Sequence, residues 1–314
     1  MTTIAQRLAD ASRPTMSFEF FPPKTAAGVG QLHQTVGELR PLRPDFVSVT
    51  YGATGSSRDR TIEATQLIST QTPVTTMGHL TCVGQTASDL RTVLDAYARV
   101  NVQHVLAVRG DPEGGPTAPW QTYPGGLSNA TELVRLVKEA GDFCVGVGAF
   151  PDVHPERRDA ALDARVLLAK QEAGAEFAIT QLFFRAESYF ALVDRLRTIG
   201  CTLPIIAGIM PVTDLAQIER FAILSGAELP DDVVRRLRAV ADDPEAVSAV
   251  GVQIAVELCQ ELLDGGVPGL HFFTQNRSRA TADVLSTLRG RPRPLTERWS
   301  DPPARPRGVR QGRW

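Results

Sequence analysis

The chain has 314 residues, of which 43% are hydrophobic and 22% are charged, a composition typical of a folded protein with a large apolar core. Its formal net charge of -2 gives no overall attraction to nucleic acid or to an anionic membrane, so the expected partners are small molecules. Domains of alternating strands and helices often fill this length as one unit. We expect one such domain over residues 1–290, followed by a solvent-exposed Arg/Pro-rich tail over residues 291–314.

The cysteines and the apolar segments indicate the cellular compartment expected for the protein. Four cysteines lie far apart and form no CxxC pair, which favours buried free thiols. The N-terminal region lacks a signal-peptide pattern, and no run of about 18 apolar residues occurs. We therefore expect a protein of the reducing cytoplasm. The cysteines are Cys82, Cys144, Cys201 and Cys259.

Eight short segments of apolar and β-branched residues follow one another, each bounded by turn residues and separated from the next by a helical pattern. This alternation indicates parallel strands joined by crossover helices, and eight is the number that closes a barrel. The sequence therefore predicts the α/β class, as a single (βα)8 barrel. The predicted strands are 17–21, 46–52, 76–82, 104–111, 144–150, 177–184, 204–210 and 269–274.

Helical periodicity is clearest over 88–100, 128–140 and 159–175, where apolar residues recur at spacings of three and four. The connection between the seventh and eighth strands is longer and predicts extra helices over 214–226, 230–240 and 245–266. We interpret these helices as an elaboration of the barrel and not as a second domain. The first dozen residues are expected to form a short helix or to be mobile.

Polar residues gather at the predicted carboxyl ends of the strands, where barrels of this class carry their chemistry. Any one of them alone could equally be a hydrogen-bonded structural group. Their convergence on one end of the barrel favours a functional site. They are Glu19, Thr50, His79, Arg109, Asp111, His154, Gln181, Asn276 and Arg277.

Glu19 is the most informative of these residues. It stands among Phe18, Phe20 and Phe21, and a carboxylate is costly to bury in its ionised form, so the sequence favours a protonated acid that can donate its proton. His79 and His154 lack metal-ligand spacing, so we expect no metal. Glycines occur in RGDPEGG (109–115), but neither GxGxxG nor a Walker loop is present, which argues against a Rossmann domain.

The segments around these residues resemble the methylenetetrahydrofolate reductase family, from about Met16 to Leu288. The matching motifs occur in the family's order. They are SFEFFPPK (17–24), FVSVTYGA (46–53), HLTC (79–82), RGD (109–111), VHPE (153–156), AITQLFF (178–184), GIMP (208–211) and HFFTQNR (271–277).

The resemblance implies an enzyme that reduces 5,10-methylenetetrahydrofolate to 5-methyltetrahydrofolate for methionine synthesis, with a hydride from NADH or NADPH. It implies that Glu19 is the general acid that protonates N10 of the folate and opens the ring to an iminium ion. Asp111 and Thr50 join Glu19 as implied catalytic residues. The implied substrate-binding residues are Gln181, Asp111, Gln217, Phe221 and Arg277, and the implied cofactor-binding residues are Thr50, His79, Arg109, Gly110, Phe150, His154, Asp163 and Lys170.

The expected flavin region departs from the family pattern. The family carries the hydride through bound FAD, and the helix after the fifth strand contributes to that site. Val166 and Ala169 stand where the family has an asparagine and an arginine, and Phe150 replaces a tyrosine. Losing one charged contact to a diphosphate costs about 1.5–3 kcal/mol. We therefore hypothesise direct transfer from the nicotinamide to the folate in a ternary complex.

Several alternatives stay open. FAD could be held differently, with Arg165 or the pair Arg157 and Arg158 supplying the missing charge, which would give a conventional ping-pong reductase. A folate-dependent barrel methyltransferase and a non-catalytic folate sensor are the rival classes. The sequence does not separate NADH from NADPH, and it leaves a monomer and a small homo-oligomer open.

Overall fold

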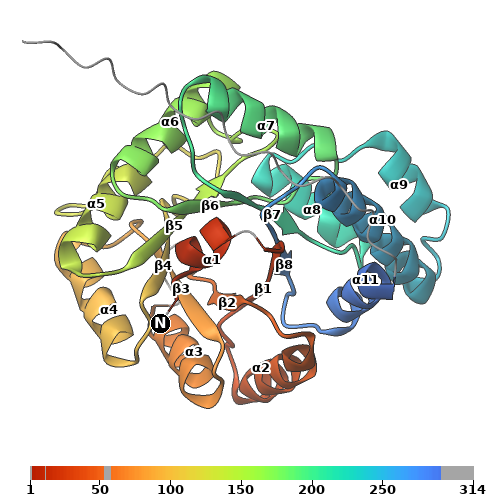
Figure 1. Cartoon of the computed structure of the whole chain (residues 1–314), viewed down its shortest axis with the longest axis horizontal. Helices are drawn as coiled ribbons and strands as arrows, with labels where there is room; N and C mark the ends of the chain where they lie inside the picture. Colours follow the sequence, from red (N-terminus) through yellow and green to blue (C-terminus); the bar gives the residue numbers. More distant parts are fainter. Residues whose placement is uncertain (1, 11, 53–57, 291–314) are drawn as a thin grey trace, which may run out of the picture.

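The computed structural model describes residues 2–10, 12–52 and 58–290, and these residues form a closed barrel of eight parallel strands in chain order (Figure 1). The predicted (βα)8 barrel is therefore confirmed. The predicted tail over residues 291–314 lies outside the described residues. The strands are β1 (Thr15–Phe20), β2 (Phe46–Val49), β3 (Thr75–Thr81), β4 (His104–Val108), β5 (Cys144–Ala149), β6 (Phe177–Thr180), β7 (Ile205–Ile209) and β8 (Gly269–Phe273).

Apart from α1, the helices form an outer layer around the strands, and all six ranges predicted as helical are confirmed within a few residues. Three helices fill the long connection between β7 and β8, as expected. The helices are α1 (Ile4–Asp10), α2 (Ala26–Leu39), α3 (Arg58–Gln71), α4 (Ala87–Arg99), α5 (Ala130–Ala140), α6 (Ala160–Glu172), α7 (Ala186–Thr198), α8 (Leu215–Ser225), α9 (Asp231–Arg238), α10 (Pro244–Asp264) and α11 (Arg279–Gly290), with a short 3-10 helix, η1 (Arg40–Leu42), after α2.

Several strands end earlier than the sequence predicts, because their last apolar residues leave the sheet. After β6, Leu182 and Phe184 pack against residues of α8, α9 and α10 in a separate apolar cluster. After β4, Gly110 adopts a φ of 84° and turns the chain away from the strand direction. The predicted residues Arg109, Asp111 and Gln181 therefore lie in the loops that rise from the strand ends.

The short helix α1 closes the amino end of the barrel and lies at the centre of the ring in Figure 1. Ile4 and Leu8 pack against interior residues such as Phe46 and Phe177. The backbone N–H of Ile4 donates to Nε2 of His104, 3.3 Å away, at the start of β4. With α1 packed into the amino end, the opposite, carboxyl end is the one at which barrels of this class bind their ligands.

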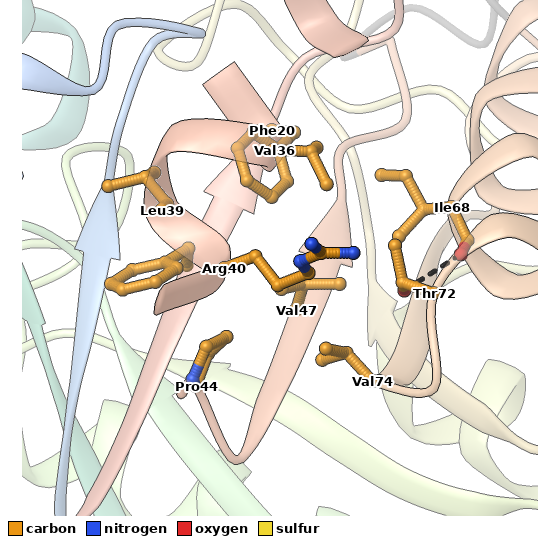
Figure 2. Close-up of a pocket in the computed structure, with 10 residues that line it drawn as sticks. Phe20, Val36, Leu39, Arg40, Pro44, Val47, Ile68, Thr72 and Val74 are labelled. Atoms are coloured by element: carbon orange, nitrogen blue, oxygen red, sulfur yellow. Dashed lines mark hydrogen bonds between the residues drawn. The ribbon is translucent and has the colours of Figure 1, made fainter. Parts of the chain in front are cut away.

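Residues that point outward from the strands form the main core beneath the helices. Phe18 and Phe20 of β1 belong to this core and are fully buried. Figure 2 shows a small pocket in this layer, between β1, β2 and the helices α2 and α3. Its lining is mostly apolar and includes Phe20, Val47 and Ile68. This pocket lies outside the barrel and is not part of the strand-end site.

The helix α10 is long and apolar enough to cross a membrane by length and composition alone. On its buried face Val256 and Cys259 pack in the main core beneath the helices, and Ile254 packs in the separate cluster with α8 and α9. A helix that covers a barrel meets the same composition test, so α10 is accounted for by its packing. All four cysteines are buried free thiols, as predicted.

Candidate active site

Glu19 points into the barrel near its carboxyl end and is only 8% exposed. Its Oε2 atom lies 3.5 Å from Nε2 of His79 on β3 and 3.4 Å from Nε2 of His271 on β8. Burial of Glu19 was expected, but its expected neighbours were wrong. Because successive side chains of a strand point to opposite faces, Phe18 and Phe20 face the helices while Glu19 faces two imidazoles.

A side chain of the outer helical layer fixes the backbone of His79. The hydroxyl of Tyr97 on α4 donates to the backbone oxygen of His79 at 2.8 Å, and a Cβ on Gly78 would overlap the Tyr97 ring. Burial lowers the pKa of His79 to about 4, with an opposing effect from Glu19. His79 is therefore neutral near pH 7, and its Nε2 atom makes no hydrogen bond within the described part of the chain.

His271 was not among the predicted site residues, although it lies in the HFFTQNR motif. It is fully buried, and its ring stacks on Phe46 with centroids 5.7 Å apart. Its Nδ1 atom lies 2.7 Å from Oγ of Ser17, and its Nε2 atom lies 3.3 Å from Oγ of Ser48. Inward alternation along the eighth strand could have suggested this residue, but the pairing of β8 with β1 joins segments far apart in sequence.

The loop after β8 fixes the carboxyl end of β1. The hydroxyl of Thr274 donates to the backbone oxygen of Glu19 at 2.6 Å. The side chain of Asn276 accepts from the N–H of Phe21 and donates to its carbonyl, both at 2.9 Å. Asn276 is thus a structural group of the rim, and the neighbouring Arg277 side chain is exposed to solvent.

Three further predicted residues lie half-buried in the segments that leave the strand ends. Thr50 directly follows β2, and its N–H continues the sheet by donating to the carbonyl of Phe20 at 2.9 Å. Burial raises the pKa of Asp111, and nearby Arg109 opposes that rise. The side-chain oxygen of Gln181 accepts from the N–H of Leu182 at 2.9 Å, which leaves its amide N–H groups directed elsewhere.

Gln217 and Phe221 share a face of α8 at a spacing of four residues, as expected. Both are half-buried. Phe221 packs against the apolar cluster that includes Leu182 and Phe184, so part of its ring has a core role. The remaining surface of these two side chains is accessible to a ligand.

The predicted residues beyond β4 and β5 form a second cluster. Arg109 pairs with Glu156 at 2.6 Å and lies over the Trp120 ring at 4.7 Å. The N–H of Glu156 donates to Nδ1 of His154 at 3.2 Å, and the edge of the Phe150 ring meets His154 at 4.6 Å between centroids. Burial lowers the pKa of His154 to about 4, so this histidine is a neutral acceptor.

Asp163 and Lys170, two of the implied cofactor-binding residues, make their polar contacts within the protein. Asp163 accepts from the N–H of His154 at 2.7 Å and pairs with Arg157 at 2.9 Å. Lys170 is buried and donates to the carbonyl of Gly148 at 3.2 Å. Burial, with Arg157 adding to it, lowers the pKa of Lys170 to about 8.

Positions 166 and 169, where this chain departs from the family pattern, carry apolar side chains. Val166 lines a small recess beside Phe150 and Lys170, and neither Val166 nor Ala169 carries a polar group for a ribityl chain or a diphosphate. Of the charges that could serve, Asp163 and Lys170 already have internal partners. Positions 166 and 169 therefore lack the polar groups that the resemblance implies for contacts with FAD.

The structure is a (βα)8 barrel with a buried glutamate side chain beside two imidazoles at the carboxyl end of its strands. Such an arrangement defines a barrel enzyme suited to general acid chemistry. Among residues 2–10, 12–52 and 58–290, no group of three or more His, Cys, Asp or Glu side chains could hold a metal ion.

The chain belongs to the methylenetetrahydrofolate reductase family, whose model matches residues 3–289. It is 38% identical over 277 residues to the 5,10-methylenetetrahydrofolate reductase of Escherichia coli K12, covering 88% of this chain and 91% of that one. It is 37% identical over 290 residues to the Pectobacterium carotovorum protein of the same name, covering 91% and 94% of the two chains.

Two more distant matches add context. A probable methylenetetrahydrofolate reductase (NADH) of Oryza sativa is 32% identical over 294 residues, which cover 90% of this chain and 49% of that protein. A solved protein of Clostridium thermocellum, which binds two copies of 5-methyl-5,6,7,8-tetrahydrofolic acid, superimposes with a TM-score of 0.60 at 12% identity over 90% and 97% of the chains. At that identity the superposition supports the barrel fold alone.

Proposed function

We propose that this protein reduces 5,10-methylenetetrahydrofolate to 5-methyltetrahydrofolate with a hydride from NADH or NADPH, by direct transfer without a flavin. The observation that carries the proposal is Glu19, a buried acid at the open end of a barrel whose sequence matches the reductase family over nearly its whole length. A carboxyl group buried beside two imidazoles at the strand ends is placed to give a proton to a substrate nitrogen.

In this proposal Glu19 protonates N10 of the folate, which opens the five-membered ring and leaves an electrophilic iminium carbon at N5. Asp111 and Gln181 bind the amino and amide edge of the pterin, since both are half-buried near the mouth and offer an acceptor and N–H donors. Gln217 and Phe221 supply a polar and an aromatic contact from α8. Arg277, which is exposed, pairs with an anionic group of the substrate at the rim.

The hydride then passes from C4 of the nicotinamide to the iminium carbon within one ternary complex, which requires the two rings to lie face to face. Thr50, His79, Arg109 and Gly110 are the residues we assign to the nicotinamide nucleotide side of the site. His154 and Phe150 complete the wall beside them. Support for direct transfer comes from the internal bonding of Asp163 and Lys170 and from the apolar side chains of Val166 and Ala169.

The conventional route through FAD is the second candidate. The observation that favours it is the exposure of two arginines, Arg158 just before α6 and Arg165 within it, which are accessible to a phosphate. An absorbance spectrum of the purified protein separates the two routes. Direct transfer predicts no flavin band, full activity without added FAD and sequential kinetics. A stoichiometric flavin band, or ping-pong kinetics, would instead establish the second candidate.

A further inference from the structure

The hydrogen bonds around His271 carry information about which form of Glu19 the barrel favours. Ser17 has one hydroxyl hydrogen and two neighbours, the carbonyl of Leu270 at 3.2 Å and Nδ1 of His271 at 2.7 Å. When that hydrogen is donated to Leu270, Ser17 accepts from His271, and the imidazole carries its proton on Nδ1. Nε2 is then an acceptor, and it lies 3.4 Å from Oε2 of Glu19.

An acceptor at that position matches a protonated Glu19 and repels an ionised one. The titratable side chains that face Glu19 are His79 from β3 and His271 from β8, and β2 contributes the hydroxyl of Ser48. Within the described residues no lysine or arginine pairs with Glu19. A carboxylate here would lack a fixed cation, while the acid O–H has a buried acceptor in Nε2 of His271, which it shares with the Ser48 hydroxyl.

We propose that His271 is a positioning residue for the reductase, whose Nε2 atom accepts the acid hydrogen of Glu19 and so keeps that hydrogen in place until substrate arrives. Ser17 fixes the required tautomer by accepting from Nδ1. The stacking of Phe46 on the imidazole holds the ring in this orientation. This inference rests on the proposed function for its role in turnover, although the hydrogen bond itself is independent of substrate.

His79 cannot take this role in the same way. Its Nε2 atom is 3.5 Å from the same carboxylate oxygen but makes no hydrogen bond, and no serine fixes its other nitrogen within the described residues. His271 is therefore the partner that discriminates between the acid and the carboxylate. His79 contributes burial of the same carboxylate oxygen.

The test is the infrared band of the protonated Glu19 carboxyl, obtained as the pH-dependent difference between a protein and its Glu19→Gln form. Substituting His271→Asn leaves a polar group near Ser17 but none at the Nε2 position. We expect the acid band of this variant to disappear about one pH unit lower than in the unmodified protein. His271→Gln, which restores a side-chain carbonyl near that position, is expected to recover part of the shift.

Two further variants provide a second test of the hydrogen bond and a control. Ser17→Ala removes the acceptor for Nδ1–H, which favours the opposite tautomer, and is expected to move the band in the same direction should His271→Asn fail to fold. His104→Asn, a change at a buried histidine of the amino end, is the matched control and is expected to leave the band unchanged. If the band of His271→Asn and Ser17→Ala stays in place or persists to higher pH, His271 donates to a carboxylate and the inference is wrong.

Activity provides the second readout. The alkaline limb of kcat/KM for methylenetetrahydrofolate reduction should move down by the same amount in His271→Asn, with folate binding retained. If the unmodified protein does not reduce methylenetetrahydrofolate, the proposed function fails, and the infrared titration still decides the hydrogen bond. A uniform fall in rate at every pH, with an unmoved limb, would contradict a role for His271 in holding the proton.

Discussion

The Oε2 atom of Glu19 lies 3.5 Å from the Nε2 atom of His79, although their strands, β1 and β3, are separated in the barrel by β2. Both side chains point inward, where the strands tilt around a shared axis. Because burial lowers the pKa of His79 to about 4, this contact is one between a carboxyl group and a neutral imidazole near pH 7. The imidazole of His79 therefore does not form a fixed ion pair with Glu19 at this pH.

Substituting Glu19→Gln removes the transferable proton while keeping the shape of the side chain. We expect hydride transfer to fall by about 100- to 10,000-fold, the range that general acid catalysis contributes, with little change in folate affinity. Single-turnover oxidation of NADH, alongside calorimetric titration with folate, measures both effects. Glu63→Gln, which alters an exposed carboxylate on α3, is the control. Retained turnover in Glu19→Gln would indicate a folate sensor or a different acid.

The buried histidines predict how stability depends on pH. The pKa values of His79, His104 and His154 are each lowered to about 4 by burial, from an ordinary value of 6.5. Between these values the unfolded chain binds more protons than the folded one, so the free energy of unfolding falls as pH falls from 6.5 towards 4. Each histidine contributes at most roughly 3 kcal/mol to this loss.

Urea unfolding at a series of pH values checks this prediction, and His104→Asn is the informative variant. Removing one of the three histidines should reduce the slope of stability against pH in that window. The side-chain amide introduced by this substitution could still accept from the N–H of Ile4, so the packing of α1 need not be lost. An unchanged slope would mean that His104 titrates in the folded state as it does in the unfolded chain.

Gly78 lies where the packing of the outer core affects the position of His79. A Cβ at this position would overlap the Tyr97 ring, whose hydroxyl holds the backbone oxygen of His79. We expect Gly78→Ala to cost about 1–3 kcal/mol of stability and to lower the reduction rate by displacing His79. Gly30→Ala on α2 is the matched control, because nothing lies within 4 Å of its Cβ. It should stabilise the protein by about 0.5–1 kcal/mol, as measured by thermal unfolding.

Asn276 joins the rim of the barrel to β1 through two side-chain hydrogen bonds with Phe21, and its φ is 56°. Asn276→Ala loses both bonds and the tolerance of asparagine for this conformation, so we expect a loss of about 2–4 kcal/mol. Asn101→Ala controls for the conformation alone, because Asn101 has a φ of 59° and its side chain makes no hydrogen bond within the described residues. Equal losses in the two variants would show that the bonds to Phe21 contribute nothing.

The barrel itself could be predicted from the sequence because each strand carries its own local signal. Apolar runs such as CVGVGAF, bounded by polar turns, indicate a buried parallel strand without knowledge of its neighbours. The closed order of the strands then follows from right-handed crossovers with helices between them. The burial of Glu19 could be expected on the same local grounds.

The partners of Glu19 could not be predicted in this way. Its contacts with His79 and His271 depend on the register between strands that are distant in the chain. The neighbours of Glu19 in the sequence, such as Phe18, do not surround its carboxyl group, because they face the opposite side of β1. The flavin region shows the same limit. That Asp163 and Lys170 are engaged by Arg157 and by the carbonyl of Gly148 depends on side-chain directions that spacing along α6 does not specify.

The fate of the nicotinamide hydride tests the central proposal most directly. Purified protein would be given 5,10-methylenetetrahydrofolate and NADH or NADPH carrying deuterium at both C4 positions, in ordinary water, and the product methyl group would be analysed by mass spectrometry. Direct transfer predicts that deuterium from the nicotinamide is retained in the methyl group of 5-methyltetrahydrofolate. A methyl group that carries solvent hydrogen instead would show an exchangeable carrier between the two substrates and would contradict the account.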